Sequence, residues 1–168
     1  ETNKQRELSY VLQATIDALT GCKNRRAFDS DIAALMNDHQ PFALALVDID
    51  NFKSINDTWG HLNGDIVLRN VAREGLQVLQ PLEISLYRYG GEEFAVAAVV
   101  DSAQQGYLLA EKIRHGVESQ PFGLGQNPIH LTISLGLETR EVGHARITEL
   151  FNQLLLAADD EMEKAKQS

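Results

Sequence analysis

The sequence predicts an α/β domain of the α+β type, in which a central, mostly antiparallel sheet is flanked by helices. Three observations favour this fold class. The run at 42–47 is apolar throughout, two strand-like runs flank Gly90 and Gly91, and segments with helical spacing of apolar residues separate these strands. The resulting order, β-α-β-β-α-β, is typical of ferredoxin-like and palm domains.

Length and charge restrict the kinds of protein this can be. The chain has 168 residues, of which 43% are apolar and 23% charged, as expected for one domain with a substantial core. The net charge of −9 opposes binding to nucleic acid and anionic membranes, and no apolar run is long enough for a membrane helix. We therefore expect neither a nucleic-acid partner nor direct membrane contact. The single cysteine, Cys22, fits a cytoplasmic location, and the parent protein is a candidate for tethering to the inner membrane.

The chain is expected to begin with an N-terminal linker helix at 1–15, coming from a missing upstream region, and to continue as the main domain at 16–168. Leu8, Val11, Leu12 and Thr15 fall on one face of this helix. This stripe fits two arrangements equally well: a coiled coil that extends upstream, or a helix packed against the domain.

A turn at 17–26 contains residues that commonly start helices. The next helix has a buried stripe of Phe28, Ile32, Leu35 and Met36. Spacing alone favours solvated side chains for Arg25 and Arg26.

The run at 42–47 is apolar on both faces, which predicts a central strand covered on both sides. Asp48 stands at its end, and 51–57 follows as a loop or short helix. Ionic and amide side chains are too concentrated beside this core strand for an ordinary surface loop: Asp48, Asp50, Lys53, Asn56, Asp57 and Asp65. We expect a functional site here, because ligands collect at such strand ends.

Asp65 is expected to cap a helix whose apolar residues continue to Leu79. Pro81 then begins an extended run that leads into a tight hairpin, which is expected because Gly90 and Gly91 can both take positive φ without a Cβ clash. Glu92 and Glu93 start the second strand of this hairpin. Since neighbouring strand residues point to opposite faces, the two carboxylates are expected to have different roles.

The remainder of the chain is expected to complete the alternation of helices and strands. Ser102 starts a helix with Leu109, Ile113 and Val117 inward. A loop at 120–128, a strand at 129–137 and an amphipathic helix at 147–162 follow.

In this topology the first strand and the hairpin are neighbours in one sheet, which brings Asp48 and Glu92 within reach of a common site. Two carboxylates and a carbonyl, such as that of Ile49, are hard oxygen ligands that suit Mg²⁺. Lys53 and Lys166 would supply positive charge for the phosphates of a substrate.

Four separated motifs give the chain its resemblance to the GGDEF family of bacterial diguanylate cyclases, over Asp17 to Lys166. Residues 89–94 resemble the family signature in its GGEEF form, and 48–57 resemble D-x-D-x-F-K-x-x-N-D. Residues 60–65 resemble G-H-x-x-G-D, and 17–26 resemble D-x-L-T-G-x-x-N-R-R. The resemblance implies that 16–168 is a GGDEF catalytic domain.

The resemblance also implies a reaction and its partners. The family condenses two GTP molecules into cyclic di-GMP and two pyrophosphates with Mg²⁺ or Mn²⁺, across a homodimer whose domains meet face to face. An upstream sensory domain in the parent protein would control this pairing. There are two rival hypotheses. The first is a GTP-binding regulatory module with weak or no turnover, and the second is a nucleotidyl cyclase with another product, which Asp65 disfavours.

Matching positions imply the roles of individual residues. Asp48, the Ile49 carbonyl and Glu92 resemble the metal ligands. Glu93 resembles the second carboxylate, which is either a further metal ligand or part of the activation of the ribose 3′-hydroxyl. The substrate-binding positions are Gly90 and Gly91 against the nucleotide, Lys53 and Lys166 with the backbone of Asn51 and Phe52 at the phosphates, and Asn56 and Asp65 at guanine.

The carboxylate of Asp65 is chemically suited to select guanine over adenine. A carboxylate accepts hydrogen bonds from N1–H and the 2-amino group of guanine, whereas adenine presents an acceptor at N1 and has no 2-amino group. An unsatisfied buried polar group discriminates strongly between substrates. Asp65 therefore favours GTP over ATP.

The sequence departs from the family at two places. The family's inhibitory product site is R-x-x-D, but residues 81–84 read Pro-Leu-Glu-Ile, so we expect no product inhibition there. Near the C-terminus, Glu163 replaces the usual tyrosine, and the chain stops before the family's G-R-N.

Overall fold

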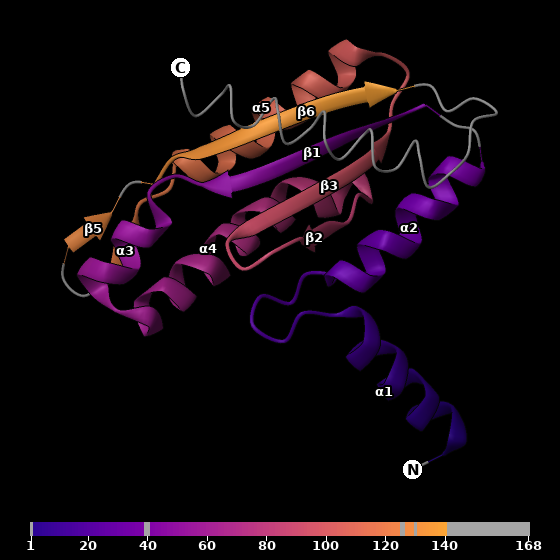
Figure 1. The fold of residues 1–168 in the computed structure, drawn as a ribbon, viewed down its shortest axis with the longest axis horizontal. Helices are drawn as coiled ribbons and strands as arrows, with labels where there is room; N and C mark the ends of the chain where they lie inside the picture. The colour runs from indigo at the N-terminus through magenta and orange to yellow at the C-terminus, as the bar shows by residue number, and fades with distance from the viewer. Residues whose placement is uncertain (1, 39–40, 125–126, 130, 141–168) are drawn as a thin grey trace.

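A computed structural model describes residues 2–38, 41–124, 127–129 and 131–140 (Figure 1). Its helices and strands run in the order α1 (Asn3–Thr15), α2 (Arg25–Asn37), β1 (Phe42–Ile49), α3 (Phe52–Trp59), α4 (His61–Leu79), a 3₁₀ turn (Gln80–Leu82), β2 (Leu86–Arg88), β3 (Glu93–Val99), α5 (Ala103–Glu118), β4 (Phe122–Leu124), β5 (Asn127–Ile129) and β6 (Ile133–Arg140). The helix predicted at 147–162, with Lys166 beyond it, lies outside the described residues.

The main sheet has the strand order β2-β3-β1-β6, and all three pairings are antiparallel. The two strands in the middle, β1 and β3, are separated in the chain by two helices and β2, while β6 completes the outer edge. This is the strand order of a ferredoxin-like β-α-β-β-α-β core. The fold class predicted from the sequence is confirmed.

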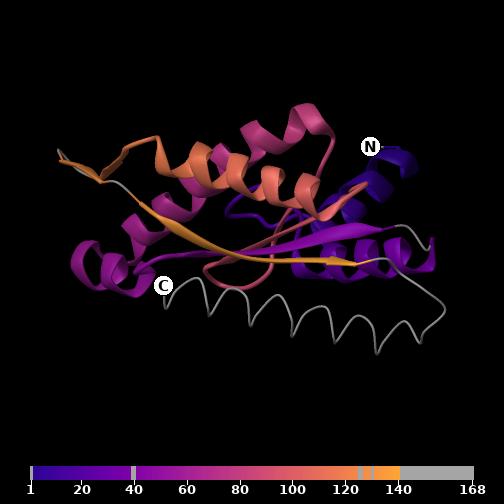
Figure 2. The ribbon, with the colours of Figure 1, turned by 90° about the horizontal axis from the view of Figure 1, so that it is seen from above.

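Helices cover both faces of the sheet. Figure 2 shows α4 and α5 on the same side of it. On this side Ala45, Val47 and Ile49 of β1 belong to the main core, whereas Leu44 and Leu46 pack on the other side with Phe28 of α2. Every residue of β1 is buried, because its neighbours fill the space above and below it. The prediction of a central, doubly covered strand is confirmed.

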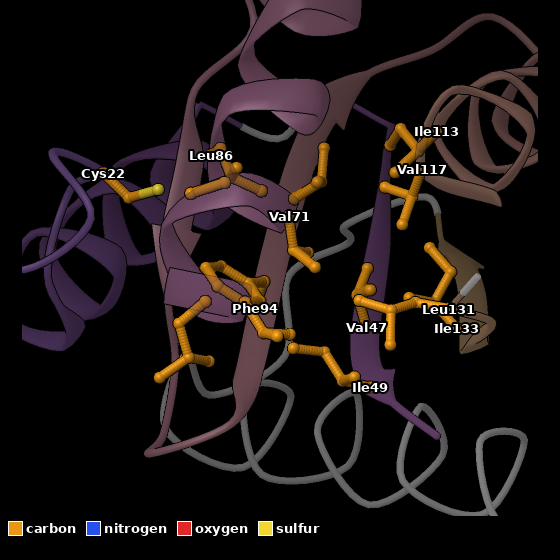
Figure 3. Close-up of a cluster of buried hydrophobic side chains, with 14 of the residues drawn as sticks. Cys22, Val47, Ile49, Val71, Leu86, Phe94, Ile113, Val117, Leu131 and Ile133 are labelled. Carbon is orange, nitrogen blue, oxygen red and sulfur yellow. The ribbon is translucent and has the colours of Figure 1, made fainter. Parts of the chain in front are cut away.

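The main core joins the sheet to α4 and α5 (Figure 3). Phe94 of β3, Val71 of α4 and Ile113 of α5 are each 3% exposed or less. Burying a side chain of this size stabilises the fold by about 1.5–3 kcal/mol. This core fixes the ends of β1 and β3 relative to each other, and it therefore fixes the positions of the polar residues at those ends.

Helix α1 forms where predicted, but it contributes no buried residue. Thr2 caps it through a capping box with Gln5. Leu8, Val11 and Leu12 are each more than half exposed, and the helix extends away from the sheet in Figure 1. Within this chain the predicted apolar stripe therefore faces solvent.

The hairpin differs from its prediction. Strand β2 covers only Leu86–Arg88, because Pro81 continues the helical path in a 3₁₀ turn, where its missing N–H costs nothing. Neither glycine of the turn has positive φ. Instead, the N–H groups of Tyr89 and Gly90 both donate to the Glu93 carbonyl, which closes a wider turn over 89–92.

The region after α5 also differs. The predicted loop at 120–128 contains β4 and β5, which pair with each other. The predicted strand at 129–137 is two strands, because β5 ends at Ile129 and β6 begins at Ile133. In contrast, the start of α5 is confirmed: the Ser102 hydroxyl accepts from the Gln105 N–H.

Candidate active site

Asp48 and Glu93 stand directly opposite each other on β1 and β3. Opposed residues of antiparallel strands share one face, with Cβ atoms about 4.5–5.5 Å apart. The Asp48 side chain is 3% exposed, the only polar or charged side chain among the buried residues that the structure describes. Two carboxylates in direct opposition repel each other, so this pair needs a cation, a proton or hydrogen-bond donors to be stable.

The turn at 89–92 places the two glutamates differently. Glu93 is the first residue of β3, and a Cβ atom built on Gly90 would lie 3.5 Å from its Oε2 atom. The Glu93 carboxylate therefore bends towards the backbone of the turn. Glu92 belongs to the turn and precedes the strand, so the prediction that the two glutamates are neighbouring strand residues on opposite faces was wrong. The two glutamates differ instead because Glu92 lies in the turn and Glu93 lies in the strand.

The segment after β1 holds the start of α3 close to the end of the sheet. Asn51 has a left-handed conformation, with φ 59° and ψ 28°, which asparagine tolerates better than most residues. Asp50 is fixed to the start of β6: its N–H donates to the Thr132 carbonyl at 3.0 Å, and its carboxylate accepts from the Thr132 hydroxyl at 2.8 Å. The Phe52 side chain packs into the main core, whereas Lys53 is exposed.

Asn56 on α3 lies against Gly64 on α4. A Cβ atom at Gly64 would overlap the side-chain oxygen of Asn56, so the absence of a side chain lets the two helices meet here. Asp65, half-buried, is the next residue of α4. The structure thus brings Asn56 and Asp65, the two residues predicted to read guanine, to one place.

The prediction that Asp65 caps α4 was wrong. The helix begins at His61 after Gly60, whose φ of 85° provides the break in the chain. Asp65 is therefore inside the helix, beyond its first turn. This removes the structural explanation for an acid at this position and leaves its side chain available for another role.

Arg88, the last residue of β2, connects the turn to the segment after α1. Its Nη1 atom lies 3.2 Å from both carboxylate oxygens of Asp17, and its Nη2 donates to the Gly91 carbonyl at 2.8 Å. Burial tends to raise the pKa of Asp17, but hydrogen bonds from Thr20 and the charge of Arg88 outweigh it, so the pKa lies below its ordinary value.

Arg25 contacts the first residue of the same turn. Its guanidinium lies 3.9 Å from the centre of the Tyr89 ring, and its Nε pairs with Asp29 at 3.1 Å. The Arg25 side chain is nevertheless 47% exposed and Arg26 is exposed as well, so the prediction of solvated side chains is confirmed. Stacking of this kind contributes about 0.5–1 kcal/mol at an exposed site.

One feature of the site, the pairing of Arg88 with Asp17, was not predicted from the sequence. Arg88 and Asp17 are 71 residues apart, and nothing in either local pattern indicates that they pair. Their shared position beside recognised motifs was the available signal.

In the part of the chain that the structure describes, no three His, Cys, Asp or Glu side chains gather closely enough to hold a metal ion by themselves.

The chain belongs to the GGDEF family. The family model described as "Diguanylate cyclase, GGDEF domain" matches residues 14–168, which include β1, the 89–92 turn and the α3–α4 pair. The fold and the site thus define a GGDEF domain, as the motifs indicated.

Relatives with assigned names agree with this family. The chain is 38% identical to "Probable diguanylate cyclase DgcF" of Escherichia coli K12, over 93% of this chain and 50% of the relative. It is 40% identical to "Diguanylate cyclase VdcA" of Vibrio cholerae, over 74% of this chain and 37% of the relative. The chain therefore spans half or less of these relatives.

A solved structure supports the same assignment. The crystal structure of the coiled coil and GGDEF domain of DgcB from Caulobacter crescentus, in complex with c-di-GMP, has a TM-score of 0.84 and 30% identity. The match covers 98% of this chain and 86% of that one. Among the described residues of this chain, no helix has both the length and the apolar character needed to span a membrane.

Proposed function

We propose that this domain condenses two GTP molecules into cyclic di-GMP and releases two pyrophosphates. The observation that carries the proposal is the buried Asp48 directly opposite Glu93, at the sheet end where α3 begins. Acidic groups concentrated beside a core strand repel one another and cost stability. They suit a site that holds a cation between its carboxylates and the phosphates of a substrate. The named relatives are diguanylate cyclases, which supports the same reaction.

A divalent metal ion fits the donor atoms of this site. GGDEF diguanylate cyclases generally depend on divalent metals. We assign Asp48, the Ile49 carbonyl and Glu92 as the ligands of Mg²⁺ or Mn²⁺, because hard oxygens suit these ions. An ion with so few protein ligands takes its other ligands from water and substrate phosphates. When bound, it would offset the charge of the triphosphate and of the leaving pyrophosphate.

The substrate phosphates would lie between the start of α3 and the turn. Asn51 and Phe52 present backbone N–H groups at the helix N-terminus, where the helix dipole favours an anion. Lys53 is exposed beside them and free to reach a phosphate group. Across the site, Gly90 and Gly91 have no side chains to keep the nucleotide away from the backbone. Lys166 is proposed as a further phosphate contact from the family's pattern alone.

Guanine would be read where α3 and α4 meet. Asn56 is held by its contact with Gly64, and Asp65 follows on α4. The carboxylate can accept from N1–H and the 2-amino group of guanine, which adenine cannot match. The close approach of the two helices supports this assignment, because it holds the Asn56 side chain against Gly64, the residue before Asp65.

Glu93 has a position suited to the reacting hydroxyl. Its carboxylate lies beside the turn and opposite the Asp48 position. A carboxylate there would accept the proton of the ribose 3′-hydroxyl as this oxygen attacks the phosphorus of the second nucleotide. A second metal ligand is the other role open to Glu93.

Catalysis would take place in a homodimer. Each domain holds one GTP, and the two phosphodiester bonds of the product require two nucleotides to meet face to face. Helix α1 supports pairing of this kind, because Leu8, Val11 and Leu12 form an exposed apolar stripe.

We infer that residues 1–15 link an upstream sensory domain to the catalytic domain at 16–168. We place the domain in the cytoplasm, where GTP is found, with the parent protein tethered or free.

Product analysis tests this proposal. The chain is fused behind a leucine-zipper dimer in register with α1, incubated with GTP and Mg²⁺, and the products are separated by chromatography. We expect cyclic di-GMP and pyrophosphate, and no cyclic dinucleotide from ATP. GTP binding without turnover in this forced dimer would instead support the regulatory module.

A further inference from the structure

Arg88 makes a bridge between the segment that follows α1 and the turn that carries Glu92. One side of its guanidinium contacts Asp17 and the other contacts the Gly91 carbonyl, at 3.2 Å and 2.8 Å. A guanidinium is planar and its donors have fixed directions. This one group therefore sets the separation between Asp17 and the backbone just before Glu92.

The Asp17 end of the bridge is firmly anchored. Its carboxylate accepts from the Thr20 N–H at 3.0 Å and from the Thr20 hydroxyl at 2.7 Å. Its own N–H donates to the Cys22 carbonyl at 2.7 Å. Asp17 is thus held in position before Arg88 reaches it.

The backbone beside Arg88 is fixed to the same segment. The Lys23 N–H donates to the Leu86 carbonyl at 3.1 Å, and the Arg88 N–H donates to the Lys23 carbonyl at 2.8 Å. These bonds join the segment after α1 to the outer edge of β2. The guanidinium extends this attachment from the strand edge into the turn.

The Gly91 end is the part of the turn that most needs support. Tyr89 and Gly90 close the base of the turn through the Glu93 carbonyl. Gly91 is exposed, and a Cβ atom built on it would touch nothing within 4 Å. Packing therefore does not restrain this residue, whereas the bond from Arg88 to its carbonyl does.

We propose that Arg88, oriented by Asp17, is a positioning residue that fixes the turn carrying Glu92 for catalysis. The inference rests on the function proposed above, and it adds that the exit of α1 and the catalytic turn are coupled through one guanidinium. Neither residue touches the substrate in this role. Loss of the bridge should lower the rate of the chemical step and leave GTP binding largely intact.

Steady-state kinetics of the forced dimer test this role. We expect Arg88→Lys and Asp17→Asn each to lower kcat by about tenfold or more, with KM for GTP within about twofold. Lysine keeps the charge but lacks the fork that reaches both partners. The double variant should lose no more than the worse single variant, because the two residues act as one unit.

A matched control separates this role from general stability. Arg114 also bridges two carboxylates, Glu111 and Glu118, each at 2.7 Å, on α5. Arg114→Lys should leave kcat at the wild-type value. Wild-type kcat in fully folded Arg88→Lys and Asp17→Asn dimers would overturn the proposal.

A second measurement does not depend on activity. Hydrogen exchange of the Tyr89 and Gly90 amides, which donate to the Glu93 carbonyl in the turn, should be about tenfold faster in Arg88→Lys than in wild type, and unchanged in Arg114→Lys. Unchanged exchange in Arg88→Lys would overturn the positioning role even in an active enzyme. A wild-type chain that makes no product would contradict the proposed function, and the exchange rates would still decide whether Arg88 holds the turn.

Discussion

Asp48 and Glu93 occupy directly opposed positions on β1 and β3, with Asp48 almost completely buried. On the rest of this face, the corresponding β1 positions Leu44 and Leu46 are apolar. The sheet thus changes from apolar packing to paired acids at the end where α3 begins. This change marks the end of the sheet that carries the candidate site.

The contact between Asn56 and Gly64 predicts an effect on nucleotide affinity. In Gly64→Ala the new methyl group would displace the Asn56 side chain. We expect the Kd for GTP, measured by calorimetry, to rise about five- to tenfold, the size of one lost hydrogen bond.

Gly116→Ala on α5 is the matched control. A Cβ atom at Gly116 would also come close to a side chain of another helix, that of Val78 on α4, at 3.0 Å. This variant should bind GTP as wild type does. An unchanged Kd in Gly64→Ala would show that Asn56 does not contact the base.

Acid should weaken the Asp17–Arg88 pair. Since the pKa of Asp17 is lowered in the folded state, its stabilising contribution is present above its unfolded pKa of about 4. This contribution is lost as the pH falls from there through the folded-state pKa. Asp17→Asn should therefore be less stable than wild type at pH 7, and this difference should shrink as the pH falls through the folded-state pKa of Asp17. Urea unfolding at several pH values measures this, and a constant difference down to the lowest pH would contradict it.

The thiol of Cys22 should react slowly in the native protein. The side chain is 1% exposed, and burial raises its pKa, so little thiolate is present or accessible. We expect a colorimetric disulfide reagent at pH 8 to label it at least about a hundredfold more slowly than in urea. Similar rates in both conditions would mean that the loop at 17–23 opens readily.

The segment before the hairpin should not confer product inhibition. Residues 81–84 have neither the arginine nor the aspartate of the family's product site. Their first two residues belong to the 3₁₀ turn at Gln80–Leu82, and Glu83 after it is left-handed. Initial rates should not change when cyclic di-GMP is added at micromolar concentrations. A clear fall in rate that Glu83→Ala reverses would contradict this prediction.

Strong local patterns allowed much of the fold to be predicted. The apolar run at 42–47 correctly predicted a central strand. The turn at 17–26 and Ser102 correctly predicted helix starts, because Asn24 and Ser102 cap α2 and α5. The weaker patterns misled. Gly90 and Gly91 suggested a two-residue turn, but two N–H groups converge on the Glu93 carbonyl and widen it.

The candidate site could be predicted only in part. Motifs located Asp48, Asn56 and Asp65, because each lies beside a recognisable strand or turn. The pairing of Arg88 with Asp17 could not be foreseen, since it joins residues 71 apart whose own neighbourhoods do not indicate a partner. The cap assigned to Asp65 failed because Gly60 starts α4 earlier.

The most direct measurement is the rate of cyclic di-GMP formation from GTP and Mg²⁺ by the forced dimer, for wild type, Asp48→Asn and Asp101→Asn. Asp101 is an exposed residue beside the start of α5 and serves as the control. We expect product from wild type and Asp101→Asn, and a loss of about a hundredfold or more in Asp48→Asn. Equal rates in Asp48→Asn and wild type, or no product from a wild-type dimer that binds GTP, would contradict the proposed cyclase.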